Sequence, residues 1–336
     1  MAGAAAAGGP VTGAGVPVPE HAVLAAAPAA GGRPSVTYRQ AGDRCVLVEY
    51  GPPELDLRLN FHVLRMLSAL GADPPPGLLD AAPGLRSVLL CFDPSRTART
   101  ALVDHLHTLH ERQPDLSGVT LPSRRVTLPL AFDDTATREA VVRYARTIRP
   151  DASNTRGGNN IDYIAAQNGL PGRDALYEAI LATEWWTAFT GFAPGLPFLF
   201  PLRGPTALSV PKYNPTRAWT PEGAVGIGGP CVAIYPAESP GSYQLFGRTL
   251  PVSDVFARNR VFGDDPFLLR AGDRVRFTLC GEEELLELRR QVLEDQYVYR
   301  IEDAPLALAA HVRGAVPGGT GHPDGSGRAW AGGEVP

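Results

Sequence analysis

Residues 210–250 constrain the fold more than any other stretch of the chain. They read VPKYNPTRAWTPEGAVGIGGPCVAIYPAESPGSYQLFGRTL, a mixture of polar residues, glycines and prolines that no long buried strand could hold. The apolar runs are short, at 225–227, 232–235 and 243–246, and turn-forming residues separate them. This pattern predicts short β-strands that present polar loops, and loops on a rigid scaffold are where binding groups usually lie.

Size and charge limit the class of protein. The 336 residues are 44% hydrophobic and 20% charged, which predicts a globular protein with room for two domains. A formal net charge of -4 gives no electrostatic reason to bind nucleic acid, and no apolar run reaches the roughly 20 residues that cross a bilayer. We therefore expect a small or neutral ligand, no nucleic-acid partner and no membrane insertion.

Cysteines and histidines are the residues that would indicate a metal site or disulfides. The four cysteines are far apart and form no C-x-x-C motif, which favours reduced, buried thiols in a cytoplasmic protein. Three histidines fall on one predicted helix, but no nearby carboxylate or cysteine completes a ligand set. We expect exposed surface histidines and no metal. The residues concerned are Cys45, Cys91, Cys231, Cys280, His105, His107 and His110.

The first part of the chain predicts a small α/β domain. Residues 1–34 are rich in Ala, Gly and Pro and are expected to be disordered. From residue 35 the pattern has the order β-β-α-β-β-α, which predicts a ferredoxin-like domain over 35–113 with both helices on one face of an antiparallel sheet. The expected strands are 35–40, 45–50, 78–82 and 87–92. The expected helices are 57–70, with Asp56 as its N-cap, and 97–112.

A polar, proline-containing linker at 114–125 marks the expected domain boundary. Residues 126–312 then hold many short strands and a few helices, which predicts a partly closed β-barrel and an α+β fold class overall. The Gly- and Pro-rich tail 313–336 is expected to be disordered. In this half we expect strands at 126–132, 185–189, 267–269, 274–279 and 297–301 and helices at 135–149, 174–183 and 281–293.

Two glycine-rich loops lie in the same half. Residues 154–169 run into a short helix, and their polar side chains either bind a ligand at the helix N-terminus or, as Asn159 or Asn160, simply cap it. Residues 191–199 (GFAPGLPFL) contain two glycines and two prolines and predict a shaped loop. That loop is either a structural connection or a source of backbone N–H groups for a ligand oxygen.

Four motifs in order resemble the family that contains allophanate hydrolase subunit 1, its related kinase-inhibitor proteins and the corresponding 5-oxoprolinase subunits. They are GFAPGLPFL from Gly191, AVGIGG from Ala224, IYPAESPGSYQLFGRT from Ile234 and AGDRVRF from Ala271. The resemblance implies a small α/β domain joined to a cyclophilin-like β-barrel. Within the family, KYNPTRAWTPEGAVGIGG from Lys212 looks most like the carboxyltransferase region of urea carboxylase and urea amidolyase, which moves a carboxyl group from carboxybiotin to urea.

Carboxyl transfer to a urea-like nitrogen requires hydrogen bonds to a flat amide, donors for a developing oxyanion and a base for the nitrogen's proton. The resemblance therefore points to catalytic roles for Lys212, Glu222, Tyr243 and Arg248, with Glu222 or Asp162 as the candidate base. It points to substrate-binding roles for Asn160, Asp162, Tyr213, Asn214, Arg217, Trp219 and Gln244. The alternatives are structural: Arg217 and Arg248 pair with Glu222 and Glu238, Trp219 belongs to the core, and Glu222 lies in an exposed turn.

The chain lacks several parts of a complete biotin enzyme. Neither Met1 nor Met66 is followed by lysine, as a biotinylation site requires, and no ATP-binding motif or amidase serine signature is evident. The resemblance implies biotin on a partner chain, ATP used by the complex, and an obligate partner of the subunit 2 type, together with biotin carboxylase and biotin carrier chains. The alternatives are a subunit of an ATP-dependent 5-oxoprolinase or allophanate hydrolase, and a kinase-inhibitor-type regulatory binder.

Overall fold

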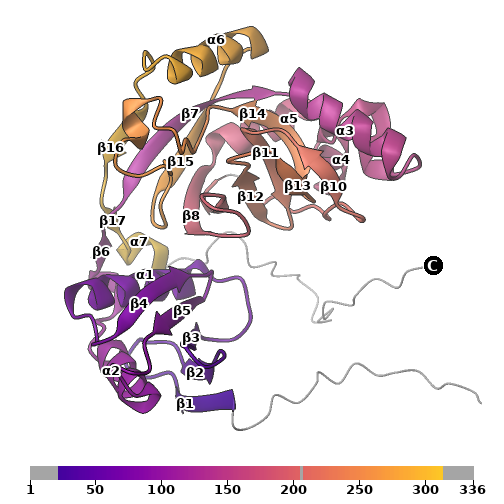
Figure 1. The fold of residues 1–336 in the computed structure, drawn as a ribbon. Helices are drawn as coiled ribbons and strands as arrows, with labels where there is room; N and C mark the ends of the chain where they lie inside the picture. The colour runs from indigo at the N-terminus through magenta and orange to yellow at the C-terminus, as the bar shows by residue number, and fades with distance from the viewer. Residues whose placement is uncertain (1–21, 205–206, 313–336) are drawn as a thin grey trace, which may run out of the picture.

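A computed structural model describes residues 22–204 and 207–312 (Figure 1). The described chain has two parts, a five-stranded sheet with two helices and a β-barrel with further helices. The expectations for residues 1–21 and for the tail 313–336 lie outside the described residues. The α+β arrangement predicted from the order of elements is present.

The N-terminal sheet has the strand order β1-β2-β3-β5-β4, and all neighbouring strands are antiparallel. Helices α1 and α2 pack on one face, where alternate residues of the strands are buried. A ferredoxin-like topology is not confirmed, and β1 lies inside the segment 1–34 that the sequence predicts to be disordered. The elements are β1 (Val23–Ala27), β2 (Val36–Gln40), β3 (Cys45–Tyr50), α1 (Leu57–Ala72), β4 (Leu78–Pro83), β5 (Ser87–Phe92) and α2 (Arg99–Glu111).

The second part is a closed barrel, which agrees with the cyclophilin-like expectation. Its strands follow the order β14-β11-β12-β9-β8-β15-β7, and β7 pairs again with β14 to close the ring. The long β7 also pairs with β16 through its first half. The barrel strands are β7 (Arg124–Phe132), β8 (Glu184–Thr190), β9 (Pro197–Arg203), β11 (Ala224–Gly228), β12 (Cys231–Ile234), β14 (Gln244–Thr249) and β15 (Arg274–Leu279), and β16 (Arg300–Asp303) lies outside the ring.

Helices cover the barrel because its strands carry apolar side chains on both faces. Helices α3, α4 and α5 gather at one end and α6 packs beside β7 (Figure 1). Asp134 accepts from the Ala136 and Thr137 backbone N–H groups and so caps α3. The helices are α3 (Thr135–Thr147), α4 (Ile161–Gln167), α5 (Arg173–Ala182), α6 (Glu282–Leu293) and α7 (Ala309–Val312), and the 3-10 turns are η2 (Leu116–Gly118), η3 (Ser153–Gly158) and η4 (Arg260–Phe262).

Two small ribbons complete the architecture. Strand β10 (Arg217–Thr220) pairs with β13 (Ser239–Gly241), and β6 (Thr120–Leu121) pairs with β17 (Leu306–Ala307). Two strand predictions in this half are wrong in position. Residues 267–269 form only an isolated bridge between Ser253 and Phe267, and the strand expected at 297–301 is β16, three residues later.

A buried asparagine joins the two parts. Asn60 on α1 donates its amide to the backbone oxygen of Ala188 at 3.1 Å and accepts from the Trp186 indole at 2.8 Å. Phe61 packs edge-to-face on Trp186 with 5.4 Å between ring centroids. Because Asn60 and Trp186 are fully buried, these contacts fix the middle of β8 against α1.

The N-terminal core also contains a polar cluster, here called the histidine cluster: Tyr38, Tyr50, His62, His110 and Gln113. His110 is only 3% exposed, so the prediction of exposed helix histidines is wrong for this residue. His62 Nδ1 lies 3.1 Å from Gln113 Oε1. The Tyr38 and Tyr50 hydroxyls, His110 Nδ1 and Gln113 Nε2 find no hydrogen-bond partner within the described residues.

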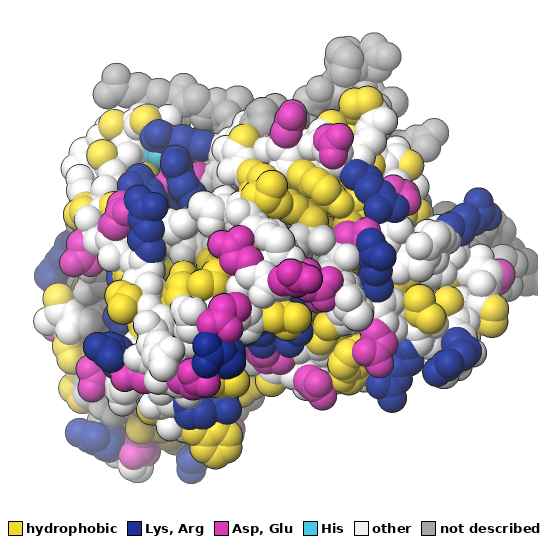
Figure 2. All heavy atoms as spheres, turned by 90° about the horizontal axis from the view of Figure 1, so that it is seen from above, with side chains coloured by type: hydrophobic (Ala, Val, Ile, Leu, Met, Phe, Trp, Pro, Cys, Tyr) yellow, Lys and Arg dark blue, Asp and Glu magenta, His cyan; other side chains and the backbone are white. Residues whose placement is uncertain are grey.

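The face of the molecule shown in Figure 2 has no large patch of like-charged side chains. Basic and acidic side chains alternate there with hydrophobic ones between them, which agrees with the small net charge. Across 22–204 and 207–312, none of the helices combines the length and the apolar character that a bilayer span requires.

Candidate functional site

A network of buried amides lies at the centre of the candidate site. Asn160, which directly precedes α4, is fully buried. Its Nδ2 donates to the Asn154 backbone oxygen at 2.7 Å, and its Oδ1 accepts from the Leu245 backbone N–H at 2.8 Å. The Tyr213 hydroxyl also lies 2.9 Å from Asn160 Oδ1. Asn160 therefore joins three segments: η3, β14, and the loop that precedes β10.

Gln244 extends the same network. Its Nε2 donates to the Pro211 backbone oxygen at 2.8 Å, and its Oε1 accepts from Asn154 Nδ2 at 3.0 Å. Both polar ends of Gln244 and of Asn160 are thus occupied by protein groups. We name Asn154, Asn160, Tyr213 and Gln244 the amide network, whose members are joined by hydrogen bonds within the protein.

Arg217 packs against the amide network and is only 1% exposed. Its guanidinium lies 4.4 Å from the centroid of the Tyr213 ring and donates to the Tyr243 backbone oxygen at 2.6 Å and to the Thr220 hydroxyl at 3.2 Å. Its Nε has no partner, and no carboxylate in the described parts of the chain lies within ion-pair distance. A buried guanidinium without a counter-charge is costly, so it is a natural place for an anionic group.

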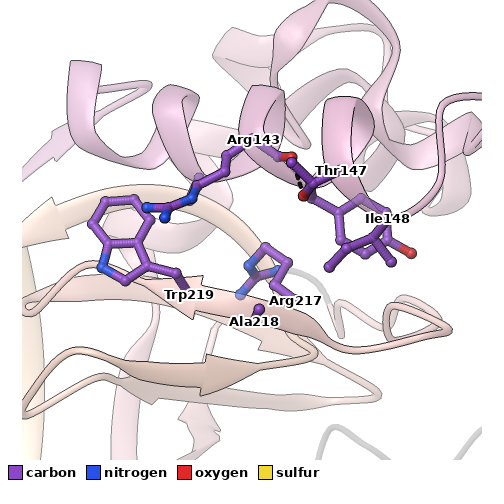
Figure 3. A pocket seen from close by; sticks show the side chains of 8 residues that line it. Arg143, Thr147, Ile148, Arg217, Ala218 and Trp219 are labelled. Atoms are coloured by element: carbon purple, nitrogen blue, oxygen red, sulfur yellow. Dashed lines mark hydrogen bonds between the residues drawn. The ribbon is translucent and has the colours of Figure 1, made fainter.

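A hollow opens beside Arg217, between α3 and β10 (Figure 3). Arg143 on α3 reaches over the half-buried Trp219 ring, with its guanidinium carbon 5.5 Å from the ring centroid. Thr147 and Ile148 border the other side. The hollow has a volume of about 20 Å³, which is room for about one water molecule. Its lining includes Arg143, Arg217 and Trp219.

Lys212 and Tyr243 form a second pair of candidate groups. The Lys212 ammonium lies 5.1 Å from the centroid of the Tyr243 ring. Gly228 makes the approach possible, because a Cβ at that position would lie 2.5 Å from Tyr243 Cδ1. Burial raises the pKa of the Tyr243 hydroxyl well above its usual value. Tyr243 therefore stays protonated and is able to donate a hydrogen bond.

Glu222 and Arg248 lie together in a separate ionic cluster. Glu222 pairs with Arg289 of α6, and its Oε2 lies 3.8 Å from an Arg248 nitrogen. Arg248 Nε also donates to the Glu222 backbone oxygen at 2.8 Å, and burial lowers the pKa of Arg248. The structural alternative, in which Arg248 pairs with Glu222, is therefore present, whereas Arg217 has no carboxylate partner within residues 22–204 and 207–312.

Asp162 makes its contacts outside the amide network. Its carboxylate forms a bidentate pair with Arg173 at 2.6 and 2.7 Å, and these hydrogen bonds lower its pKa. A general base near neutrality needs a raised pKa, so this environment opposes that role. Asn159 caps α4 through its Oδ1, which accepts from Ile161 N at 2.9 Å. The capping alternative thus applies to Asn159, and Asn160 serves the network.

The remaining predicted residues lie at the edge of the site. Asn214 is exposed, and its backbone oxygen accepts from Arg149 at 2.9 Å. In the predicted loop 191–199, two backbone N–H groups form hydrogen bonds within the loop: Gly191 N donates to Leu196 O, and Leu196 N donates to Ala193 O. Phe192 in that loop is 76% exposed.

Sequence reasoning missed Asn154, Arg143 and Arg289, which belong to η3, α3 and α6. All three lie outside residues 210–250 and meet that stretch only through the fold. Asn154 begins the glycine-rich loop 154–169 that the sequence singles out, whereas no local signal marks Arg143 or Arg289. Within the described residues, no group of three or more His, Cys, Asp or Glu side chains is arranged to hold a metal ion.

Comparison with known proteins places this geometry in a family. The model for the carboxyltransferase domain, subdomain C and D, matches residues 36–263. The chain belongs to this family. The match includes the amide network, Arg217, the hollow and the Lys212–Tyr243 pair, so the candidate site lies inside the carboxyltransferase domain.

Relatives of this carboxyltransferase domain occur in two arrangements. Urea amidolyase of Lachancea kluyveri is 35% identical over 275 residues, which cover 81% of this chain and 15% of that protein. The solved structure of K. lactis urea amidolyase matches with a TM-score of 0.77 at 34% identity, over 88% of this chain and 18% of that chain. By contrast, a 5-oxoprolinase subunit of Escherichia coli O157:H7 is 28% identical over 70% of this chain and is itself 92% covered. The chain thus spans a small part of the urea enzymes and nearly all of the separate subunit.

Proposed function

We propose that this chain is one half of a urea-carboxylase-type carboxyltransferase, which acts on urea or a related amide and shares its site with a partner chain. The observation that carries the proposal is Arg217, a buried guanidinium without a carboxylate partner among the described residues, which lines the hollow beside Trp219. It lies in the segment that most resembles the urea enzymes, and those relatives are more similar to this chain than the 5-oxoprolinase subunit.

The size of the hollow supports a shared site. At about 20 Å³ it holds about one water molecule, so it cannot enclose urea together with the ring of carboxybiotin. A second protein surface over α3 and β10 would deepen it. The partner we propose is the second half of the carboxyltransferase, the family's subunit 2. Biotin would reside on a carrier chain, and ATP would be used by a biotin carboxylase chain of the complex.

The residues present fit a carboxylated, flat ligand. Arg217 and Arg143 offer guanidinium groups that suit a carboxylate, and the Trp219 face suits a planar ureido ring. When bound, carboxybiotin supplies the activated carboxyl group. The residues of this chain would hold that carboxylate and stabilise negative charge that develops on oxygen.

Lys212 and Tyr243 complete the proposed chemistry. A protonated tyrosine beside an ammonium group is a strong donor for an oxyanion. The amide network positions both groups, because Tyr213 follows Lys212 and Gln244 follows Tyr243 in the chain. For the base we retain Glu222 as the candidate, in its ionic cluster with Arg248 and Arg289. Asp162 is the weaker candidate because its pKa is lowered.

The experiment is to purify the tagged chain together with its subunit 2, a biotin carboxylase and a biotin carrier. We expect urea to stimulate ATP hydrolysis by the assembly, and avidin, which sequesters biotin, to abolish that stimulation. Assemblies that lack this chain serve as the control and should show no urea response. A urea response that does not need this chain would refute the proposal.

The second candidate is a 5-oxoprolinase subunit, and the specific observation in its favour is the 28% identity to the Escherichia coli subunit over 70% of this chain. The chain covers 92% of the Escherichia coli 5-oxoprolinase subunit but only 15% of Lachancea kluyveri urea amidolyase. In that case the chain and subunit 2 would hydrolyse ATP in response to 5-oxoproline, without a biotinylated protein and without sensitivity to avidin. The same purified assemblies distinguish the two candidates.

A further inference from the structure

Two cysteines of the N-terminal sheet face each other across neighbouring strands. Cys45 on β3 lies directly opposite Cys91 on β5, and their sulfur atoms are 2.9 Å apart. The sequence predicts isolated thiols because 46 positions separate these residues. Antiparallel pairing of β3 with β5 brings the two residues together in space.

The backbone hydrogen bonds define which kind of strand pair this is. Phe92 N donates to Arg44 O, and Tyr50 N donates to Arg86 O, so these flanking pairs are hydrogen-bonded pairs. Hydrogen-bonded and non-hydrogen-bonded pairs alternate along an antiparallel ladder, which makes Cys45–Cys91 a non-hydrogen-bonded pair. The Cα atoms of such a pair are about 4.5 Å apart, within the range that a disulfide spans.

The thiol pair lies on the accessible face of the sheet. Val46, Val48, Leu90 and Phe92 are buried beneath α1 and α2. Because side chains alternate along a strand, the two cysteines point to the opposite face, and each is half-buried rather than buried. Small thiol reagents can therefore reach both sulfur atoms.

Among the described residues, only Cys45 and Cys91 have their sulfur atoms within hydrogen-bond distance of each other. Cys231 lies in the barrel core, where burial raises its pKa to about 12. Cys280 is half-buried after β15, and burial raises its pKa to about 11. A hydrogen bond with Cys45 is the main reason that the pKa of Cys91 is raised to about 11. Either thiol of the Cys45–Cys91 pair can attack first, and the product is the same.

We propose that Cys45 and Cys91 are a reversible redox pair that closes to a cross-strand disulfide in the presence of a low-molecular-weight disulfide such as oxidised glutathione. The Cys45 thiolate attacks the glutathione disulfide, forms a mixed disulfide and releases one glutathione thiolate. Cys91 loses its proton and attacks Cys45 Sγ, which releases the second glutathione thiolate. The two cysteines together lose two electrons and two protons, and oxidised glutathione is reduced to two thiols.

The test uses the purified full chain and oxidised glutathione. Mass spectrometry should show the loss of two hydrogens, and peptide mapping without reductant should join the peptides of Cys45 and Cys91. Free-thiol titration should fall from four to two, and dithiothreitol should restore four. Persistence of four thiols, separate glutathione adducts on both residues, or a disulfide between other cysteines or other molecules would each overturn the proposal.

Variants separate this pair from general oxidation. Cys45→Ser should prevent closure and leave Cys91 unable to form an intramolecular disulfide, whereas Cys280→Ser and Cys231→Ser should still lose two thiols. Phenylarsine oxide, which bridges neighbouring thiols, gives an independent readout on the reduced protein. One equivalent should bind to the native chain and to Cys280→Ser, and none to Cys45→Ser. Equal binding to the native chain and Cys45→Ser would contradict the proposal.

Discussion

The amide network of the barrel and the histidine cluster of the N-terminal domain are both buried and polar, but they differ in how their hydrogen bonds are satisfied. Both side-chain ends of Asn160 and of Gln244 have protein partners. In the histidine cluster, His110 Nδ1 and the Tyr50 hydroxyl find none within the described residues. A satisfied network fixes a geometry, whereas an unsatisfied titratable group makes its domain sensitive to pH.

The largest expected effect comes from breaking the amide network. Asn160→Ala would leave the buried Leu245 N–H and the Asn154 oxygen unpaired, and we expect it to lower the free energy of unfolding by about 3 kcal/mol. The matched control is Asn214→Ala, because Asn214 is exposed, and it should cost less than about 0.5 kcal/mol. Urea denaturation of both variants checks this, and equal stabilities would show that the network contributes nothing.

The histidine cluster should make stability fall in weak acid. Burial, with smaller contributions from Arg33 and His62, lowers the pKa of His110 from 6.5 to about 4. Below about pH 6.5, His110 becomes protonated in the unfolded chain but stays neutral in the folded protein. The free energy of unfolding therefore decreases as the pH falls from about 6.5 to about 4. We expect a loss of about 2 kcal/mol from this residue.

Denaturation across that pH range tests the assignment. His110→Gln should reduce the slope of stability against pH, and the slope that remains belongs to His62 and His311, whose pKa values are also lowered by burial. The variant is expected to be less stable at neutral pH. His107→Gln, which changes a more exposed histidine on the same helix, should leave the slope unchanged. If the free energy of unfolding of His110→Gln depends on pH as steeply as that of the native protein, another group is responsible for the effect.

The ionic cluster around Glu222 should contribute less than either buried cluster. Glu222 and Arg289 are partly exposed, so we expect a coupling energy of about 1 kcal/mol. A double-mutant cycle with Glu222→Gln and Arg289→Gln measures it. The coupling should shrink in concentrated salt because ions screen partly exposed charges. A coupling that is unaffected by salt would place this pair with the buried networks instead.

The smallest expected effect belongs to the surface pair of Asp162 and Arg173. The Arg173 hydrogen bonds lower the pKa of Asp162. Its contribution is therefore present above the unfolded pKa of about 3.9 and is lost as the pH falls below it. We expect Asp162→Asn to cost about 0.5 kcal/mol or less at neutral pH, and nothing in strong acid. A cost that persists in strong acid would exclude the ion pair as its cause.

Local patterns predict the elements well where capping and periodicity agree. Asp56 caps α1 as expected, and β3, β5 and β15 occupy the predicted ranges. The prediction fails for β1, whose Ala-rich residues carry little strand signal and depend on pairing with β2. It fails also at 267–269, where an apolar run packs without a ladder.

The candidate site shows the same limit. Residues 210–250 do contain Arg217, Tyr213 and Gln244, which the structure brings together around Asn160. The sequence could not show that the polar groups of these residues would form hydrogen bonds with Asn154 and with backbone oxygens. It also could not show that Arg289 of α6 would pair with Glu222. Such partners come from distant segments, and only the closed barrel decides which groups remain free for a ligand.

The most direct test of the proposed carboxyltransferase half is the urea-dependent turnover of the complete assembly with Arg217→Lys in this chain. Lysine keeps the charge but loses the planar fork, so we predict that kcat/KM for urea falls by about tenfold or more while the assembly still forms. Arg143→Gln, at the exposed side of the same hollow, should lower it by a smaller factor with unchanged stability. If both variants form assemblies of normal composition and have the same kcat/KM for urea as the native assembly, the proposed role of Arg217 and of the hollow is wrong.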